Sequence, residues 1–150
     1  MRNAVTQEVG VLIVDHPLLT MNEIIDMRTH LSKKAVNGKR WNPYSKAKAS
    51  LEHVISTCAF RDHFRYVGPF WTFCYTTKRR VDPDNLDAGA RKLLFDALQR
   101  CGKLPSDTFE HVTEMRSLFR RGTSERIVVL SSSEPATQET IDYWFNVIAA

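Results

Sequence analysis

The sequence predicts a single α/β domain of the α+β type, spanning residues 1–150, in which helices flank a mixed β-sheet of about four strands. Its 150 residues, 43% of them hydrophobic and 25% charged, suffice for one domain with a substantial core. Segments with strand and helix patterns follow one another in the order strand, helix, helix, strand, helix, strand, strand, helix. That order favours a mixed sheet covered by helices. We find no internal repeat and no low-complexity segment.

The first half of the chain contains one expected strand and two expected helices. The short apolar run 9–14 is closed by Asp15-His16-Pro17 and is typical of a buried strand. Helical spacing of apolar residues predicts a helix over 22–33, with Asn22 able to cap it, and another over 45–60. Between these helices, residues 33–44 contain glycine, proline and four cations, so we expect an exposed, mobile loop.

The second half is more strongly patterned. Aromatic and β-branched residues predict a central strand over 67–76, and apolar residues at helical spacing predict the best helix over 86–101, with Gly102 at its C-terminal cap. Two further strands, 112–119 and 126–130, are expected to be joined as a hairpin near Arg120-Arg121-Gly122, and a last helix covers 137–148.

Composition and spacing exclude several classes of protein. The net charge of +4 is a moderate excess that nucleic-acid binders share with many other proteins. The three cysteines include no Cys-x-x-Cys pair and the histidines no His-x3-His pair, which argues against a zinc knuckle and a disulfide framework. No apolar run reaches ~18 residues, and residues 1–10 lack the apolar stretch of a signal peptide. We therefore expect a cytoplasmic protein.

Three carboxylates among cations are the most informative feature. Asp82 and Asp84 lie in Arg79-Arg80-Val81-Asp82-Pro83-Asp84-Asn85-Leu86, and Asp107 follows further along. Residues i and i+2 of an extended segment point to the same side, so Asp82 and Asp84 can face one cation. Magnesium favours one or two carboxylates with water and phosphate oxygens, and it activates water for attack on a phosphodiester. The alternative is structural, since Asp84 or Asn85 can simply cap the helix that starts at Leu86, and spacing alone favours the cap.

The wider motif resembles a known family. Arg79–Leu86, then Lys92-Leu93-Leu94-Phe95-Asp96-Ala97-Leu98, Gly102-Lys103-Leu104-Pro105-Ser106-Asp107 and Glu110-His111-Val112 are similar to the RusA family of Holliday-junction resolvases. The likeness covers about residues 79–112. Upstream it is limited to Pro17-Leu18-Leu19-Thr20-Met21-Asn22, which is similar to a proline-rich segment ending in asparagine. Members of the family are small, homodimeric, magnesium-dependent endonucleases of phages, prophages and bacteria.

The resemblance implies a role for several residues. Asp82, Asp84 and Asp107 match the metal-binding aspartates, with manganese as the substitute for magnesium, and Lys92 matches an essential lysine. There are two departures from the family pattern. The helix is about one turn longer before Lys92, which displaces the lysine by ~5 Å, and Ser106 stands where the family often has an acid. Because all three principal aspartates are present, we expect an active enzyme that cuts four-way junctions as a homodimer, or other branched DNA.

Other residues are candidate DNA contacts, and Asn22, at the end of the proline-rich segment, is one of them. Lys78, Arg79 and Arg80 precede the acidic pair and can hold flanking phosphates, or they can form a solvated strand end. Phe95 lies well away from the leucine stripe of its helix, so we expect an exposed ring that stacks on a base or packs against a second subunit or the long loop. Lys92 can instead pair with Asp96 at i+4.

A rival hypothesis from another class is a non-catalytic DNA-binding module that keeps the fold. The longer helix and Ser106 motivate it. The residues alone do not distinguish it from the enzyme.

Overall fold

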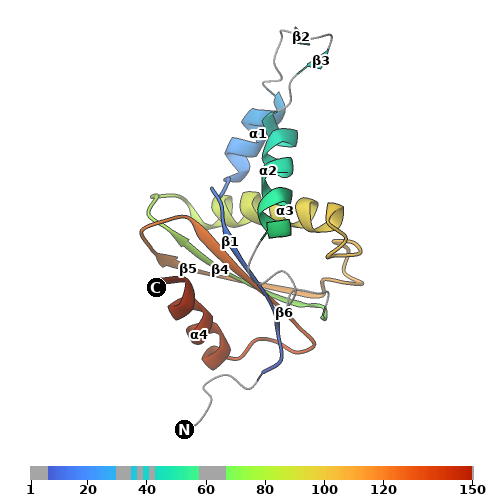
Figure 1. Ribbon diagram of the computed structural model, residues 1–150. Coiled ribbons are helices and arrows are strands. Elements are labelled where there is room, and N and C mark those ends of the chain that lie inside the picture. The colour runs from blue at the N-terminus through green and yellow to red at the C-terminus, as the bar shows by residue number, and fades with distance from the viewer. Residues whose placement is uncertain (1–6, 30–34, 37–38, 41–42, 58–66, 150) are drawn as a thin grey trace.

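The computed structural model describes residues 7–29, 35–36, 39–40, 43–57 and 67–149 (Figure 1). Its elements in chain order are β1 (Gly10–Asp15), α1 (Met21–Thr29), β2 (Ala35–Val36), β3 (Lys39–Arg40), α2 (Pro43–Thr57), β4 (Phe70–Thr77), α3 (Pro83–Arg100), β5 (Glu114–Arg121), β6 (Arg126–Ser132) and α4 (Gln138–Ala149). Four of the strands form one mixed sheet, so the predicted α+β class is confirmed. In the described part of the chain, no helix combines the length and apolar character needed to cross a membrane.

The main sheet has the strand order β1-β6-β4-β5. β6 runs antiparallel to both of its neighbours, whereas β4 and β5 run parallel, with Phe70 opposite Glu114 and Thr77 opposite Arg121. The strands joined by the crossover helix α3 are thus parallel neighbours, and β4 lies inside the sheet as its aromatic composition predicts.

Helices cover both faces of this sheet. Figure 1 shows α1, α2 and α3 on one side and α4 on the other. Because side chains alternate along a strand, Trp71, Phe73 and Tyr75 of β4 face the three-helix side, whereas Cys74 faces α4. The side chains on the two faces of the sheet therefore belong to two separate apolar clusters. The larger cluster lies between β4 and α3 and holds α3 over β4.

The structure revises two predicted connections. β5 and β6 do not form a hairpin, because β4 lies between them and pairs with both. The connection passes over the end of β4, where a Cβ at Gly122 would lie 2.9 Å from the Cβ of Thr76. The expected loop 33–44 includes the short β2–β3 pair, and its remaining residues up to 42 lie outside the described ones. The ends of the predicted helices at residues 30–33 and 58–60 also lie outside the described residues.

The crossover β4-α3-β5 decides where the candidate site residues lie. α3 begins just after the carboxyl end of β4 and runs back toward the amino end of β5. With 18 residues, α3 is about 27 Å long. Residues before α3 and residues after it are therefore held at opposite ends of the sheet.

Candidate functional site at the carboxyl ends of the parallel strands

Asp82 is the N-cap of α3. Its backbone is extended, with φ −64° and ψ 126°, and its Oδ1 accepts a hydrogen bond of 3.1 Å from the backbone N–H of Asp84. Pro83 occupies the first turn, where a missing N–H costs nothing. The sequence suggested Asp84 or Asn85 as the N-cap. That assignment is wrong, because Asp82, the residue before Pro83, already accepts a hydrogen bond from a backbone N–H of the first turn.

Asp82 and Asp84 are both exposed at this helix start. The positive end of the α3 dipole favours negative charge there, so neither carboxylate needs a metal to be accommodated. The cap occupies one oxygen of Asp82. The remaining carboxylate oxygens face solvent and are hard ligands of the kind that magnesium prefers.

Arg79 ties the β4–α3 connection to two other parts of the fold. Its Nη2 lies 2.6 Å from Oε1 of Glu23, and its Nη1 lies 3.5 Å from Oε1 of Glu125 and donates to the Leu18 carbonyl at 3.0 Å. The hydrogen bond from Arg79 to Glu23 raises the pKa of the guanidinium. The predicted phosphate contact is therefore engaged in bonds within the chain, whereas Lys78 and Arg80 remain exposed.

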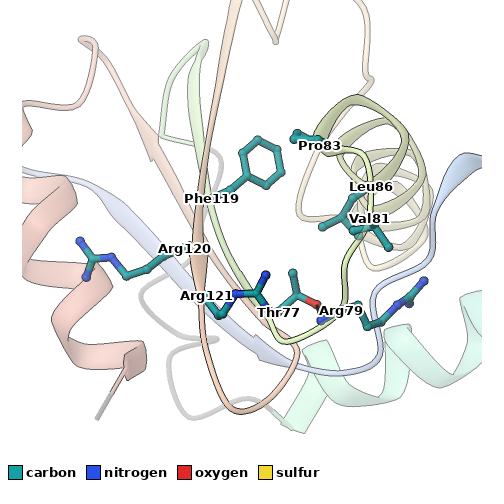
Figure 2. Close-up of a pocket in the computed structure, with 8 residues that line it drawn as sticks. All are labelled: Thr77, Arg79, Val81, Pro83, Leu86, Phe119, Arg120 and Arg121. Atoms are coloured by element: carbon teal, nitrogen blue, oxygen red, sulfur yellow. Dashed lines mark hydrogen bonds between the residues drawn. The ribbon is translucent and has the colours of Figure 1, made fainter.

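Beside this connection lies a hollow with a volume of about 180 Å³. Figure 2 shows Val81, Pro83, Leu86 and Phe119 around it, with Arg79 and Arg121 at one end. The Arg120 side chain points the other way, toward α4, where its guanidinium lies 4.3 Å from the centre of the Phe145 ring. The hollow thus combines apolar walls, one exposed aromatic ring and cations from the ends of β4 and β5.

Phe119 lines the hollow, and the sequence did not predict it as a candidate site residue. Its ring is 41% exposed and stacks on Tyr75 with centroids 5.1 Å apart. The sequence did contain a signal for this position. Ser117 and Phe119 are two residues apart in an expected strand, so their side chains are predicted to share one face of the sheet. The expected hairpin with the following strand placed the end of this strand away from α3. For that reason Phe119 was not expected beside the start of α3.

Asp87 forms a second polar group that the sequence did not indicate. Its Oδ1 accepts hydrogen bonds from the Tyr75 hydroxyl at 2.7 Å and the Ser117 hydroxyl at 2.6 Å, and its Oδ2 lies 3.2 Å from Nη1 of Arg91. Burial, followed by the charge of Asp87, raises the pKa of Tyr75, so its hydroxyl stays protonated and donates. This cluster joins β4, α3 and β5 under the apolar wall of the hollow.

The structure places Asp107 at the opposite end of the sheet. The neighbouring Ser106 Oγ lies 2.8 Å from Nδ1 of His111, and the His111 carbonyl accepts from the indole N–H of Trp71 near the start of β4. Asp82 lies beyond the far end of that eight-residue strand, so the two carboxylates are separated by roughly 20 Å. Asp107 and the acidic pair are not brought together within one chain.

Lys92 is also away from the acidic pair. It lies two helical turns beyond Asp84, about 12 Å along the axis. Its Nζ is 3.6 Å from Oδ2 of Asp96, which also accepts from the Tyr44 hydroxyl at 2.7 Å. The i+4 pairing that the sequence offered as an alternative is thus present.

One predicted DNA contact and one predicted helix cap require correction. Phe95 is only 6% exposed and packs edge-on against Trp71 and Phe73, so its ring is not available to a base. The prediction failed because α3 packs against the sheet on one side and against α1 and α2 on another, so more than one stripe of its residues is buried. Asn22 does not cap α1, because Thr20 does so through a reciprocal box with Glu23.

The fit to a magnesium ion is therefore partial. Among the described residues, no group of three or more histidine, cysteine, aspartate or glutamate side chains is placed to hold a metal. Asp82 and Asp84 supply the two carboxylates that magnesium commonly uses, and the third predicted ligand is distant. No protein-family model matches this chain, and comparison with curated proteins finds no match.

Proposed function

We propose that the protein is a magnesium-dependent endonuclease that cleaves four-way junctions or other branched DNA. The observation that carries this proposal is that the exposed Asp82 and Asp84 alternate along the chain with Val81 and Pro83, which line the hollow together with Phe119 and Arg121. Ligands of α/β proteins bind outside the carboxyl ends of parallel strands, and this hollow lies at the carboxyl ends of β4 and β5. The resemblance to the RusA family over residues 79–112 supports the same reaction.

Each group has a chemical role in this proposal. Asp82 and Asp84 would hold the ion, which supplies an activated water and neutralises charge on the phosphate. Arg121, Lys78 and Arg80 bind backbone phosphates on either side of the cut. Phe119 stacks on a base that is unpaired at the branch point, which a regular duplex does not offer. The compartment we propose for this activity is the cytoplasm of a bacterium or a phage-infected host.

The test is cleavage of a synthetic four-way junction with and without magnesium. We expect nicks in the branched substrate only, with an unbranched duplex of the same sequence left whole. Asp82→Asn abolishes nicking while junction binding persists. Intact junctions after incubation of the wild-type protein with magnesium or manganese contradict the proposal.

A matched pair of aromatic variants tests the hollow itself. Phe119→Ala weakens junction binding by a factor of roughly 5 to 150, the cost of one base–aromatic stack. Tyr143→Ala removes a ring of similar exposure, 43%, on the far face of the sheet and leaves binding unchanged. Equal effects of the two variants would place the DNA elsewhere.

A second candidate is a non-catalytic DNA-binding module. It is favoured by the distance of Asp107 from the acidic pair and by the pairing of Lys92 with Asp96. This candidate predicts junction binding that depends on Phe119 without any metal-dependent nicking. Preferential cutting of flaps instead of junctions would keep the enzyme and change its substrate.

A further inference from the structure

The carboxylate of Asp87 joins α3 to both parallel strands. Its Oδ1 accepts hydrogen bonds from the Tyr75 hydroxyl of β4 at 2.7 Å and from the Ser117 hydroxyl of β5 at 2.6 Å. Oxygen–oxygen distances this short are typical of hydroxyl groups that donate to a charged carboxylate. The other oxygen, Oδ2, lies 3.2 Å from Nη1 of Arg91, one turn further along the helix. Asp87 therefore holds polar side chains of β4, β5 and α3 at one point.

β5 is an edge strand with little buried surface. Among the described residues it pairs only with β4, and of its eight residues only Ser117 and Leu118 are partly buried. Leu118 packs on the α4 side of the sheet, whereas the hydroxyl of Ser117 bonds to α3 through Asp87. Segments with few buried contacts open locally more readily than the centre of a sheet. The position of β5 relative to α3 therefore depends on the bond between Ser117 and Asp87.

This bond also places the aromatic wall of the hollow. Phe119 follows Ser117 at an interval of two, so both side chains lie on the face that carries α3. The Phe119 ring stacks on the Tyr75 ring with centroids 5.1 Å apart, and the Tyr75 hydroxyl is bonded to the same carboxylate oxygen as Ser117. Asp87 lies three residues after Asp84, about 4.5 Å along the helix axis. One carboxylate thus relates the ring that lines the hollow (Figure 2) to the acidic pair.

We propose that Asp87 is a positioning residue on which the preference for branched over unbranched DNA depends. It fixes the Phe119 ring relative to the acidic pair, so that a base stacked on the ring and the phosphate to be cut have one spacing. Contacts to backbone phosphates are available in any duplex, whereas an unpaired base is present only at a branch. A ring that is no longer anchored keeps the first kind of contact and weakens the second. This role in selection rests on the proposed function, whereas the anchoring of β5 does not.

Four substitutions separate the hydrogen bonds of Asp87 from its charge. Asp87→Asn keeps an acceptor oxygen for both hydroxyls, whereas Asp87→Ala removes it and deprives the buried Tyr75 hydroxyl of this acceptor. Arg91→Gln removes the ion pair and leaves both hydroxyl bonds in place. Ser117→Ala breaks only the bond between α3 and β5. Because it leaves the core intact, it keeps the proposal testable if Asp87→Ala does not fold.

Asp96 provides a matched control on the same helix. Its Oδ2 accepts from the Tyr44 hydroxyl at 2.7 Å and lies 3.6 Å from Nζ of Lys92, so it has the same kinds of partner as Asp87. The tyrosine that it binds lies on α2, however, and not in the sheet. Asp96→Ala therefore reproduces the loss of a tyrosine–carboxylate bond without changing a contact of β5.

Hydrogen exchange of the backbone amides tests the anchoring without DNA. We expect Asp87→Ala and Ser117→Ala to speed exchange in β5 by roughly ten- to a hundredfold, the effect of losing one hydrogen bond to a charged group. Exchange in β6, inside the sheet, should change much less. Asp87→Asn, Arg91→Gln and Asp96→Ala should leave the ratio of β5 to β6 exchange close to that of the wild type. Equal acceleration in both strands would show a general loss of stability and overturn the anchoring.

The preference itself is tested by binding to a four-way junction and to an unbranched duplex, both without magnesium. We expect Asp87→Ala to lower the ratio of junction affinity to duplex affinity by roughly tenfold, within the loss expected for Phe119→Ala. Added to Phe119→Ala, it should lower this ratio no further, because both substitutions act through the same ring. Additive effects, or a wild-type ratio in both Asp87→Ala and Ser117→Ala, would overturn the role of Asp87 in selection.

The outcomes distinguish this proposal from the endonuclease. In a chain that nicks the junction, Asp87→Ala should raise KM and leave kcat nearly unchanged, since the acidic pair is intact. If the wild type never nicks, but faster exchange in β5 and the coupling to Phe119 are found, the positioning role is supported and the endonuclease is refuted. If the wild type nicks and the Asp87 variants select junctions as it does, the endonuclease stands and the positioning role is refuted. Equal binding of junction and duplex by the wild type also refutes the positioning role.

Discussion

Asp82 has two roles that can be separated by choosing the substitution. As the N-cap of α3 it accepts the hydrogen bond from the Asp84 N–H, and as a proposed metal ligand it supplies a negative charge. Asparagine keeps a cap oxygen of equal quality but loses the charge, whereas alanine loses both. Asp82→Asn and Asp82→Ala therefore differ in stability if the aspartate is a cap, and agree in activity if it is a ligand.

The magnitude follows from the cap geometry. The 3.1 Å bond to Asp84 satisfies one of the orphan donors of an 18-residue helix. Its loss in Asp82→Ala costs about 1 kcal/mol, within a range of about 0.5–2 kcal/mol. For a chain of 150 residues this lowers the melting temperature by about 2–4 °C. Asp82→Asn is expected to lie within ~0.5 kcal/mol of the wild type.

The assay combines urea unfolding with junction nicking on the same three proteins. We expect the stability order wild type and Asp82→Asn above Asp82→Ala, and loss of nicking in both variants. Nicking that survives in Asp82→Asn would show that the aspartate is only a cap, and the proposed metal site would have to be abandoned. Equal destabilisation by both substitutions would instead refute the cap.

Two further predictions concern how the site is held in place. Gly89→Ala gains about 1 kcal/mol in helix propensity, but its methyl group would overlap the backbone at Leu19. We therefore expect the free energy of unfolding, measured in urea, to fall by about 1–3 kcal/mol. A stabilised variant contradicts this. Burial works to raise the pKa of Glu23, but hydrogen bonds from Arg79 and Thr20 outweigh it and leave the pKa below its usual 4.5. The stability contributed by Glu23 is therefore present above that value and lost as the pH falls through the folded-state pKa. The difference in urea midpoint between wild type and Glu23→Gln should shrink from about pH 6 to about pH 3, and a constant difference would exclude the linkage.

The secondary structure was largely predictable from local signals. Apolar periodicity located α3, and the aromatic run located β4 inside the sheet. The neighbours of each strand were not predictable in the same way. The sequence suggested a hairpin because β5 and β6 are separated by a short connection, whereas the parallel pairing of β5 with β4 depends on contacts across the whole crossover.

The arrangement of the candidate site was predictable only where it depends on residues that are close together in the sequence. Asp82 and Asp84 lie together because Pro83 holds the segment between them at a helix start. The exposure of Phe95 was predicted wrongly, because a single helical stripe does not reveal that a helix is covered from two directions. Phe119 was missed for the complementary reason, since its partner Tyr75 is 44 residues away in the sequence and meets it only through the sheet.

The distance between Asp107 and the acidic pair is a consequence of topology. A helix that joins two parallel strands must run antiparallel to them, so residues that precede it and residues that follow it lie at opposite ends of the sheet. Lengthening or shortening α3 cannot change this, because both strands keep the same direction. Carboxylates that flank such a helix on its two sides, as Asp84 and Asp107 do, therefore lie at opposite ends of the sheet within one chain, however close they are to the helix in sequence.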